Sequence, residues 1–203
     1  FASCSFHTPN RQSISMNEIQ TSNLDALLPQ QMATKAERIG AAKANLDTAI
    51  MFALAFLAGA FIALGGAFAT CVATGGNELP FGVIRLLTGL AFSLGLILVV
   101  VGGAELFTGN NLIVMTWAAG NLSSKRLLRN WAVVYLGNTA GAGATALLVF
   151  ASGQYKFAAG QVGLTALRTA DFKASLEFHE AFFLGILCNI LVCLAVWLSF
   201  SAR

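Results

Sequence analysis

Charged residues are scarce in this chain of 203 residues: Asp, Glu, Lys and Arg together make up 10% of it. Soluble domains usually carry about 25%. Hydrophobic residues make up 57% of the chain, and the mean hydropathy is +0.73. The net charge is only +3 and the basic residues lie in the connecting segments, so the sequence has no electrostatic footprint for nucleic acid. This balance excludes an ordinary soluble domain and predicts an integral membrane protein.

Residues that carry catalysis or bind metals are also few. The chain has two histidines and four cysteines, and three of the cysteines lie inside apolar runs without a His or a carboxylate at ligand spacing. The sequence shows no nucleophile beside a base, no nucleotide-binding loop and no metal cluster. We therefore expect no enzyme, no metal and no cofactor. The cysteines are interpreted as small apolar fillers rather than ligands: Cys4, Cys71, Cys188 and Cys193.

The first 15 residues lack the apolar core of a signal peptide, and we interpret them as a disordered or non-native leader before a start at Met16. Residues 16–47 form a polar segment in which Pro29 stands where a helix could begin. Lys35, Arg38 and Lys43 favour a short interfacial helix there, with a solvated tail as the alternative.

From residue 48 to 203 the sequence predicts a transmembrane domain with helices over residues 48–74, 82–119, 130–152 and 180–202. The second is too long for one span, because residues 86–119 as a single helix would measure about 51 Å against a hydrocarbon core of about 30 Å. It contains a polar, glycine-bearing stretch, and we expect the helix to break near residues 104–111. A break at membrane depth is tolerated only inside protein or beside water, so it indicates a permeation path.

The distribution of basic residues predicts the orientation. Residues 120–130 contain Lys125, Arg126 and Arg129 without an acid, which places this connection and the N-terminal segment in the cytoplasm. Residues 74–85 are then external. Residues 152–180 are expected to form an external loop of mixed polarity.

Three motifs carry a family resemblance: Ala-Glu-Leu-Phe-Thr at 104–108, Tyr-Leu-Gly-Asn at 135–138, and the run from Leu184 to Trp197. Together they resemble the formate/nitrite transporter family, and most closely its bacterial formate channels. The similarity is collinear from about Leu28 to Arg203.

The resemblance implies a homopentamer in the bacterial inner membrane, each protomer having its own pore and six helices in an aquaporin-like bundle. The second and fifth helices of such a bundle are broken. This sequence supplies four of the six, so we expect it to be truncated after the fourth helix. The family's pore histidine belongs to the fifth helix, and neither His7 nor His179 matches its context.

The resemblance also assigns roles to single residues. Thr108 and Asn189 are expected to line the pore, and Lys173 to attract anions at the external vestibule. Leu106 and Val192 would form one constriction. A second, cytoplasmic constriction would combine three further residues: Phe92, Leu96 and Phe107.

Each assignment has an ordinary structural alternative. A loop lysine such as Lys173 is usually solvated, and an amide in a span such as Asn189 can simply join helices. Thr108 could cap a half-helix that begins at Gly109 or Asn110. Glu105 is expected to be structural and to accept hydrogen bonds from the backbone N–H groups that the break frees.

The resulting hypothesis is passive or proton-coupled passage of a small monovalent anion, formate first, then nitrite or hydrosulfide. The alternatives are a neutral-solute channel of aquaporin-like form and a membrane fragment without transport. The coding sequence beyond Arg203 discriminates them, since two more spans with a histidine on a broken helix support the anion channel.

Overall fold

The computed structural model describes residues 26–76 and 79–201, so the leader expected over residues 1–15 lies outside the described residues. This part of the chain is helical and contains no β-strand. The helices are α1 (Pro29–Ala44), α2 (Thr48–Ala73), α3 (Phe81–Val101), α4 (Phe107–Asn110), α5 (Ile113–Ala118), α6 (Ser124–Ala151), the 3₁₀ turn η3 (Gln154–Lys156), α7 (Gln161–Ala174) and α8 (Phe178–Ser199).

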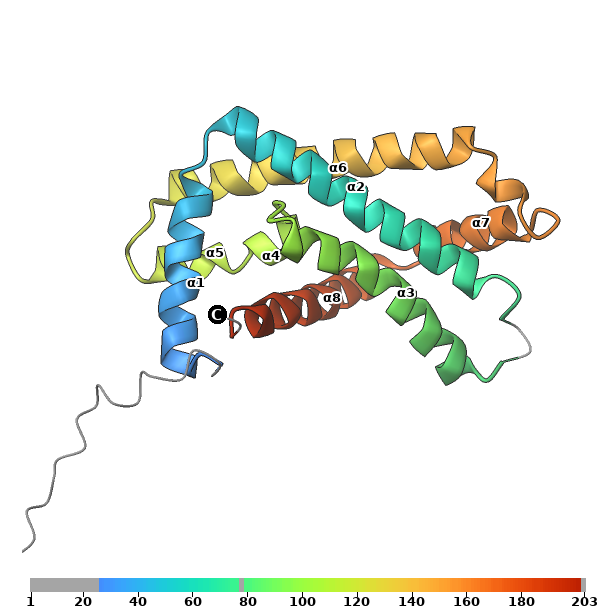
Figure 1. The fold of residues 1–203 in the computed structure, drawn as a ribbon, viewed down its shortest axis with the longest axis horizontal. Coiled ribbons are helices and arrows are strands. Elements are labelled where there is room, and N and C mark those ends of the chain that lie inside the picture. Colours follow the sequence, from blue (N-terminus) through green and yellow to red (C-terminus); the bar gives the residue numbers. More distant parts are fainter. Residues whose placement is uncertain (1–25, 77–78, 202–203) are drawn as a thin grey trace, which may run out of the picture.

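Four helices of the described chain are long and apolar enough to cross a membrane: α2, α3, α6 and α8. Figure 1 shows α2, α6 and α8 running lengthwise through the molecule, with α3 inclined between them. The prediction of an all-α membrane protein is therefore confirmed. The expected helix over residues 130–152 in fact begins at Ser124, so the basic residues that were read as a connection form its first turns.

The two longest helices, α2 and α6, approach so closely that their backbones touch. A Cβ on Gly59 would collide with the backbone of Asn138, and one on Gly141 with the backbone of Phe56. At Gly137 an added Cβ would meet the Cβ of Ala55. Small residues at helix crossings allow this approach, and the dispersion contacts it creates drive association in a bilayer.

Helix α1 runs across one end of the bundle, roughly perpendicular to the long helices (Figure 1). It begins at Pro29, where the sequence suggests a helix start, and it buries Met32, Ala36, Gly40 and Ala44, which recur every fourth residue on one face. This face packs against α5, and the Thr116 hydroxyl there donates a hydrogen bond to the Glu37 carbonyl at 3.1 Å.

The expectation of a plain loop over residues 152–180 is wrong. The segment contains η3 and the 14-residue helix α7, which begins after Gly160 and packs on the end of α2. Val162 is buried there, and the Thr74 hydroxyl is hydrogen-bonded to that of Thr165 at 3.2 Å. Mixed polarity indicated a loop because most side chains of α7 are exposed and only Val162 is buried against the bundle.

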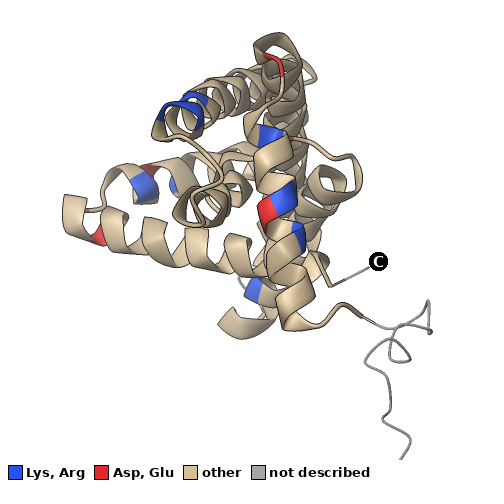
Figure 2. Cartoon of the chain, turned by 90° about the vertical axis from the view of Figure 1, so that its left-hand side faces the viewer, with Lys and Arg blue, Asp and Glu red and all other residues tan. Residues whose placement is uncertain are grey.

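Charges gather at the ends of the bundle. Figure 2 views the molecule from the end where α1 lies, and basic residues occupy α1 and the start of α6 there. The middle parts of the long helices are uncharged. Arg126 and Arg129 of α6 hold the connection between α1 and α2 in place. Their guanidinium groups donate to Asn45 Oδ1 at 2.7 Å and to the Leu46 carbonyl at 2.8 Å.

Candidate functional site

The centre of the molecule is a break in the second long helix, as the sequence predicts. α3 ends at Val101, residues 102–106 leave the helix, and α4 and α5 follow as two short helical pieces. Gly103 has a φ of +65°, a left-handed conformation that glycine adopts without strain. The chain can therefore end α3 with a tight turn and continue through α4 and α5 toward α1 (Figure 1).

Asn138 of α6 holds the break in place. Its Oδ1 accepts a hydrogen bond from the Phe107 N–H at 2.9 Å, and its Nδ2 donates to the Glu105 carbonyl at 2.9 Å and to the Ala55 carbonyl at 2.8 Å. The Glu105 N–H donates to the Leu54 carbonyl at 3.3 Å. One amide side chain thus joins α2, α6 and the break, and the freed backbone groups find partners inside the protein.

The carboxylate of Glu105 has a different role from the one expected. It accepts from Lys43 Nζ of α1 at 2.8 Å and from Asn110 Nδ2 at 2.7 Å, and the residue is 2% exposed. Its partners are side chains, whereas the freed N–H groups bond to Asn138 and to Leu54. The expectation about Glu105 is corrected because the break brings Lys43 within reach of the carboxylate. Removing a carboxylate from water is costly unless it is paired, and a cation offsets that cost better than neutral amide donors do.

Asn110 and Asn130 complete a buried polar network. Asn110 Oδ1 accepts from Lys43 Nζ at 3.3 Å, and its Nδ2 donates to Asn130 Oδ1 at 3.0 Å. Asn130 Nδ2 donates in turn to the Lys43 carbonyl at 3.4 Å. Within the described residues, no buried side-chain nitrogen or oxygen lacks a partner, so the network is fully satisfied.

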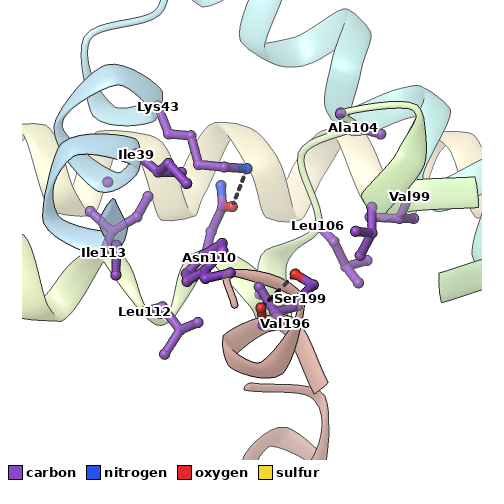
Figure 3. A pocket seen from close by; sticks show the side chains of 16 residues that line it. Ile39, Lys43, Val99, Ala104, Leu106, Asn110, Leu112, Ile113, Val196 and Ser199 are labelled. Carbon is purple, nitrogen blue, oxygen red and sulfur yellow. Dashed lines mark hydrogen bonds between the residues drawn. The ribbon is translucent and has the colours of Figure 1, made fainter. Parts of the chain in front are cut away.

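Beside this network lies a cavity of about 260 Å³ between α1, the break, α5 and α8. Figure 3 shows Lys43 reaching across it to Asn110, with Leu106 and Val99 on the opposite wall and Val196 on α8. Apart from Lys43 and Asn110 the wall is almost entirely apolar. A polar cluster at the edge of an apolar hollow is typical of a site that orients a small ligand.

Two of the predicted pore residues meet at the contact between α4 and α8. The Cys193 thiol lies 3.3 Å from the Thr108 carbonyl and 3.4 Å from Asn189 Oδ1, both of which can accept its hydrogen. Asn189, Val192 and Cys193 lie on one face of α8, the only face of that helix that is partly covered in the described structure. Cys193 thus links the Thr108 backbone to the Asn189 side chain, and Val192 lies on the same face of α8.

The sequence profile of the formate/nitrite transporters matches residues 30–203 of the chain. The chain belongs to this family. The formate channel FocA of Escherichia coli is 48% identical over 179 residues, which cover 88% of this chain and 63% of FocA. FocA of Haemophilus influenzae is 44% identical, with the same two coverages. The chain thus spans less than two thirds of the length of these relatives.

Solved structures support the same assignment. A pentameric formate channel with formate bound is similar to this chain at a TM-score of 0.73 and 49% identity, covering 77% of this chain and 61% of the channel. An ion channel of the formate/nitrite transporter family has the same TM-score at 29% identity. The resemblance read from the motifs is confirmed.

Within this formate/nitrite transporter fold, Thr108 does not cap a half-helix. α4 begins at Phe107, its N-cap position is Leu106, and Thr108 lies inside the helix. The Asn110 N–H, which a capping Thr108 hydroxyl would bind, donates instead to the Leu106 carbonyl at 2.8 Å as part of α4. The capping interpretation is wrong because the helix begins one residue before Thr108.

The expected cytoplasmic constriction is not assembled as predicted. Phe92 and Leu96 belong to α3, which enters from the end where α7 lies, so they precede the break from that side (Figure 1). Phe107 packs against the cluster of Met51, Ala55 and Val134 and edge-on to Tyr135, with ring centroids 5.5 Å apart. Its ring therefore points to α2 and α6. Leu106, by contrast, lines the central cavity.

Lys173 lies apart from the other predicted residues. It is exposed in the last turn of α7, and Figure 1 places α7 at the end of the bundle opposite α1. Lys173 therefore lies far along the molecule's long axis from the cavity beside Lys43.

Reasoning from the sequence missed the polar network. Asn110, Asn130 and Asn138 are amides in largely apolar segments, and at that depth each must hydrogen-bond within the bundle. That signal was available. Lys43 was assigned to an interfacial helix because nothing in the sequence shows that α1 turns this side chain inward.

We expect Cys193→Ala to lower the free energy of unfolding by about 1 kcal/mol, because it removes the bridge between α4 and α8. Cys188→Ala is the matched control, since Cys188 is exposed on the same helix. Its effect should stay within about 0.5 kcal/mol. Unfolding of the detergent-solubilised variants measures both, and equal losses would contradict a bridging role for Cys193.

Proposed function

We propose that the protein is a channel for formate and related small monovalent anions, nitrite and hydrosulfide among them, and that it works as a homopentamer. The observation that carries this proposal is the broken helix, held open at membrane depth by Asn138, in a chain 49% identical to a pentameric formate channel with formate bound. We assign it no catalysed reaction and no cofactor.

The proposed route follows the corrected geometry. Lys173 attracts the anion at the α7 end. The anion passes Phe92 and Leu96 on α3 and then the constriction of Leu106 and Val192, where apolar side chains exclude bulk water. Thr108 and Asn189 supply polar contacts there. Phe107 takes a supporting role and braces the break against α6.

We place the protein in the bacterial inner membrane with its N-terminus in the cytoplasm. The support is the charge distribution: the α1 end carries Lys35, Arg38 and Lys43, and the start of α6 adds further bases (Figure 2). Short segments rich in Lys and Arg stay on the cytoplasmic side.

Formate uptake into liposomes tests the function. Vesicles that contain the complete gene product should take up labelled formate in a saturable way, and nitrite should compete with it. Empty vesicles are the control. Glycerol or water passage without formate uptake would contradict the proposal and favour a neutral-solute channel.

Replacing Lys173 by alanine should lower formate flux several-fold at low salt and much less at high salt. An exposed charge attracts ions only within the Debye length, which is about 30 Å at 0.01 M and about 3 Å at 1 M ionic strength. Arg85→Ala is the matched control, because Arg85 is a base near the same end but lies over the Phe81 ring. If the Lys173→Ala variant carries the same formate flux as the unmodified protein at both salt levels, Lys173 is not part of the route.

A further inference from the structure

A second hollow lies between α2 and α6, far from the break. The two helices touch at Gly59 and Gly141 and then diverge toward their C-terminal ends, and α7 lies near the open end of this wedge (Figure 1). Hydrogen bonds fix α7 and η3 to the last turns of α2, from Thr74 to Thr165 at 3.2 Å and from Gln154 to Cys71 at 3.2 Å.

The wedge encloses a cavity of about 310 Å³. Small residues form part of its walls: Ala63 and Ala67 of α2, Ala146 of α6, and Gly163 and Ala166 of α7. The rest of the lining is larger and partly polar: Thr70, Thr145, Val149, Phe150, Gln154, Tyr155 and Val162. Ala63 lies ten residues before the end of α2, so the cavity reaches about 15 Å below the helix end. A largely apolar cavity is not filled by water, and at this depth a lipid acyl chain can fill it.

The mouth of the cavity has the character of a membrane interface. Tyr155 stacks on Phe150 with ring centroids 5.3 Å apart, and tyrosine prefers the headgroup level. Lys156 follows, its Nζ 5.6 Å from the Tyr155 ring, and neither ion pair of the described chain involves it. A shallower hollow of about 500 Å³ shares Tyr155 and Gly163 with the cavity and is lined by Lys156. The apolar cavity thus opens beside the ammonium group of Lys156.

We propose that this wedge binds one anionic phospholipid of the external leaflet. An acyl chain fills the cavity between α2 and α6, and the phosphate contacts Lys156. Charge complementarity favours this occupant over a neutral hydrophobic molecule, because the Lys156 ammonium at the mouth attracts a phosphate that carries net negative charge. A whole helix of a second copy does not fit inside the cavity, because a helix with its side chains is about 10 Å across and the cavity holds only about 310 Å³.

Photolabelling of the complete protein in vesicles tests the site. The probe is phosphatidylglycerol with a diazirine near the end of one acyl chain, in a phosphatidylcholine bilayer. Labels should concentrate in peptides that contain residues 63–70 and 145–150. Labelling spread evenly over the lipid-facing sides of α2, α6 and α8 would overturn the proposal. Absence of label from these peptides, while lipid-facing peptides of α8 are labelled, would also overturn it and show that lipid does not enter the wedge.

Two pairs of variants sharpen the result. Ala146→Phe fills the cavity and should reduce labelling of residues 63–70 several-fold, whereas Ala195→Phe, at an exposed position of α8, should leave it unchanged. Lys156→Ala should lower phosphatidylglycerol labelling about fivefold, as expected for one lysine near an anionic headgroup. Arg168→Ala removes an exposed base of α7 that lines neither hollow, and its effect should stay below about twofold. Equal losses from Lys156→Ala and Arg168→Ala would overturn the headgroup contact.

Discussion

Gly141→Ala is expected to destabilise the protein by about 3 kcal/mol or more, although it adds a single methyl group. The new Cβ would collide with the carbonyl oxygen of Phe56 and lie 2.8 Å from its carbonyl carbon. These are backbone atoms of α2 and cannot move aside as a flexible side chain does. The helices would have to separate, which would weaken the contacts near Gly137 and Gly59 as well.

Gly143→Ala is the control for this prediction. Gly143 lies two residues further along α6, and a Cβ there would meet nothing within 4 Å. It should leave stability unchanged or raise it slightly, because alanine favours the helix. Thermal unfolding in detergent compares the two variants. Equal midpoints would show that α2 and α6 do not pack as closely as the structure places them.

The transmembrane architecture could be predicted because the bilayer fixes it. A span needs about 20 apolar residues, so the excess length of residues 82–119 and the polar stretch around Glu105 required a break. Helix α7 could not be predicted in this way. Val162 is the one buried residue of this helix over 161–174, and the surface of α2 and α6 that covers it exists only after those helices have folded.

The site could be predicted only in part, for a related physical reason. Family motifs identify Thr108 and Asn189, and the structure brings them together through Cys193. The partners that hold the break come from distant parts of the chain: Lys43 is 62 residues from Glu105, and Asn138 is 31 residues from Phe107. Hydropathy reports which residues enter the membrane but not which polar side chains meet there.

The network around Glu105 connects α1 with the proposed route. Glu105 and Asn110 flank Thr108 in sequence, and both bind Lys43 of α1. Any displacement of α1 therefore acts on the residues on either side of Thr108. The ion pair also explains why a charged residue is tolerated at this depth, because the lysine neutralises it within 2.8 Å.

Lys43→Met should consequently be among the most damaging single substitutions in the chain. It leaves the Glu105 carboxylate, whose side chain is 3% exposed, without its cation, and breaking a buried pair in this way costs about 3 to 5 kcal/mol. We expect loss of stability and, in liposomes, loss of formate flux as the break shifts. Lys125→Met is the matched control, because Lys125 is exposed at the start of α6, and its effect should stay within about 0.5 kcal/mol.

The double variant Lys43→Met/Glu105→Gln separates the ion pair from simple packing. Glutamine keeps a carbonyl oxygen that can accept from Asn110 Nδ2, now 2.7 Å from the carboxylate, and it carries no charge. Replacing both members of a buried pair by neutral groups is often nearly neutral, so the double variant should recover most of the stability that Lys43→Met loses. The double variant could instead lose as much free energy of unfolding as the two single variants together. That result would show that Lys43 stabilises α1 through its packing and not by neutralising the charge of Glu105.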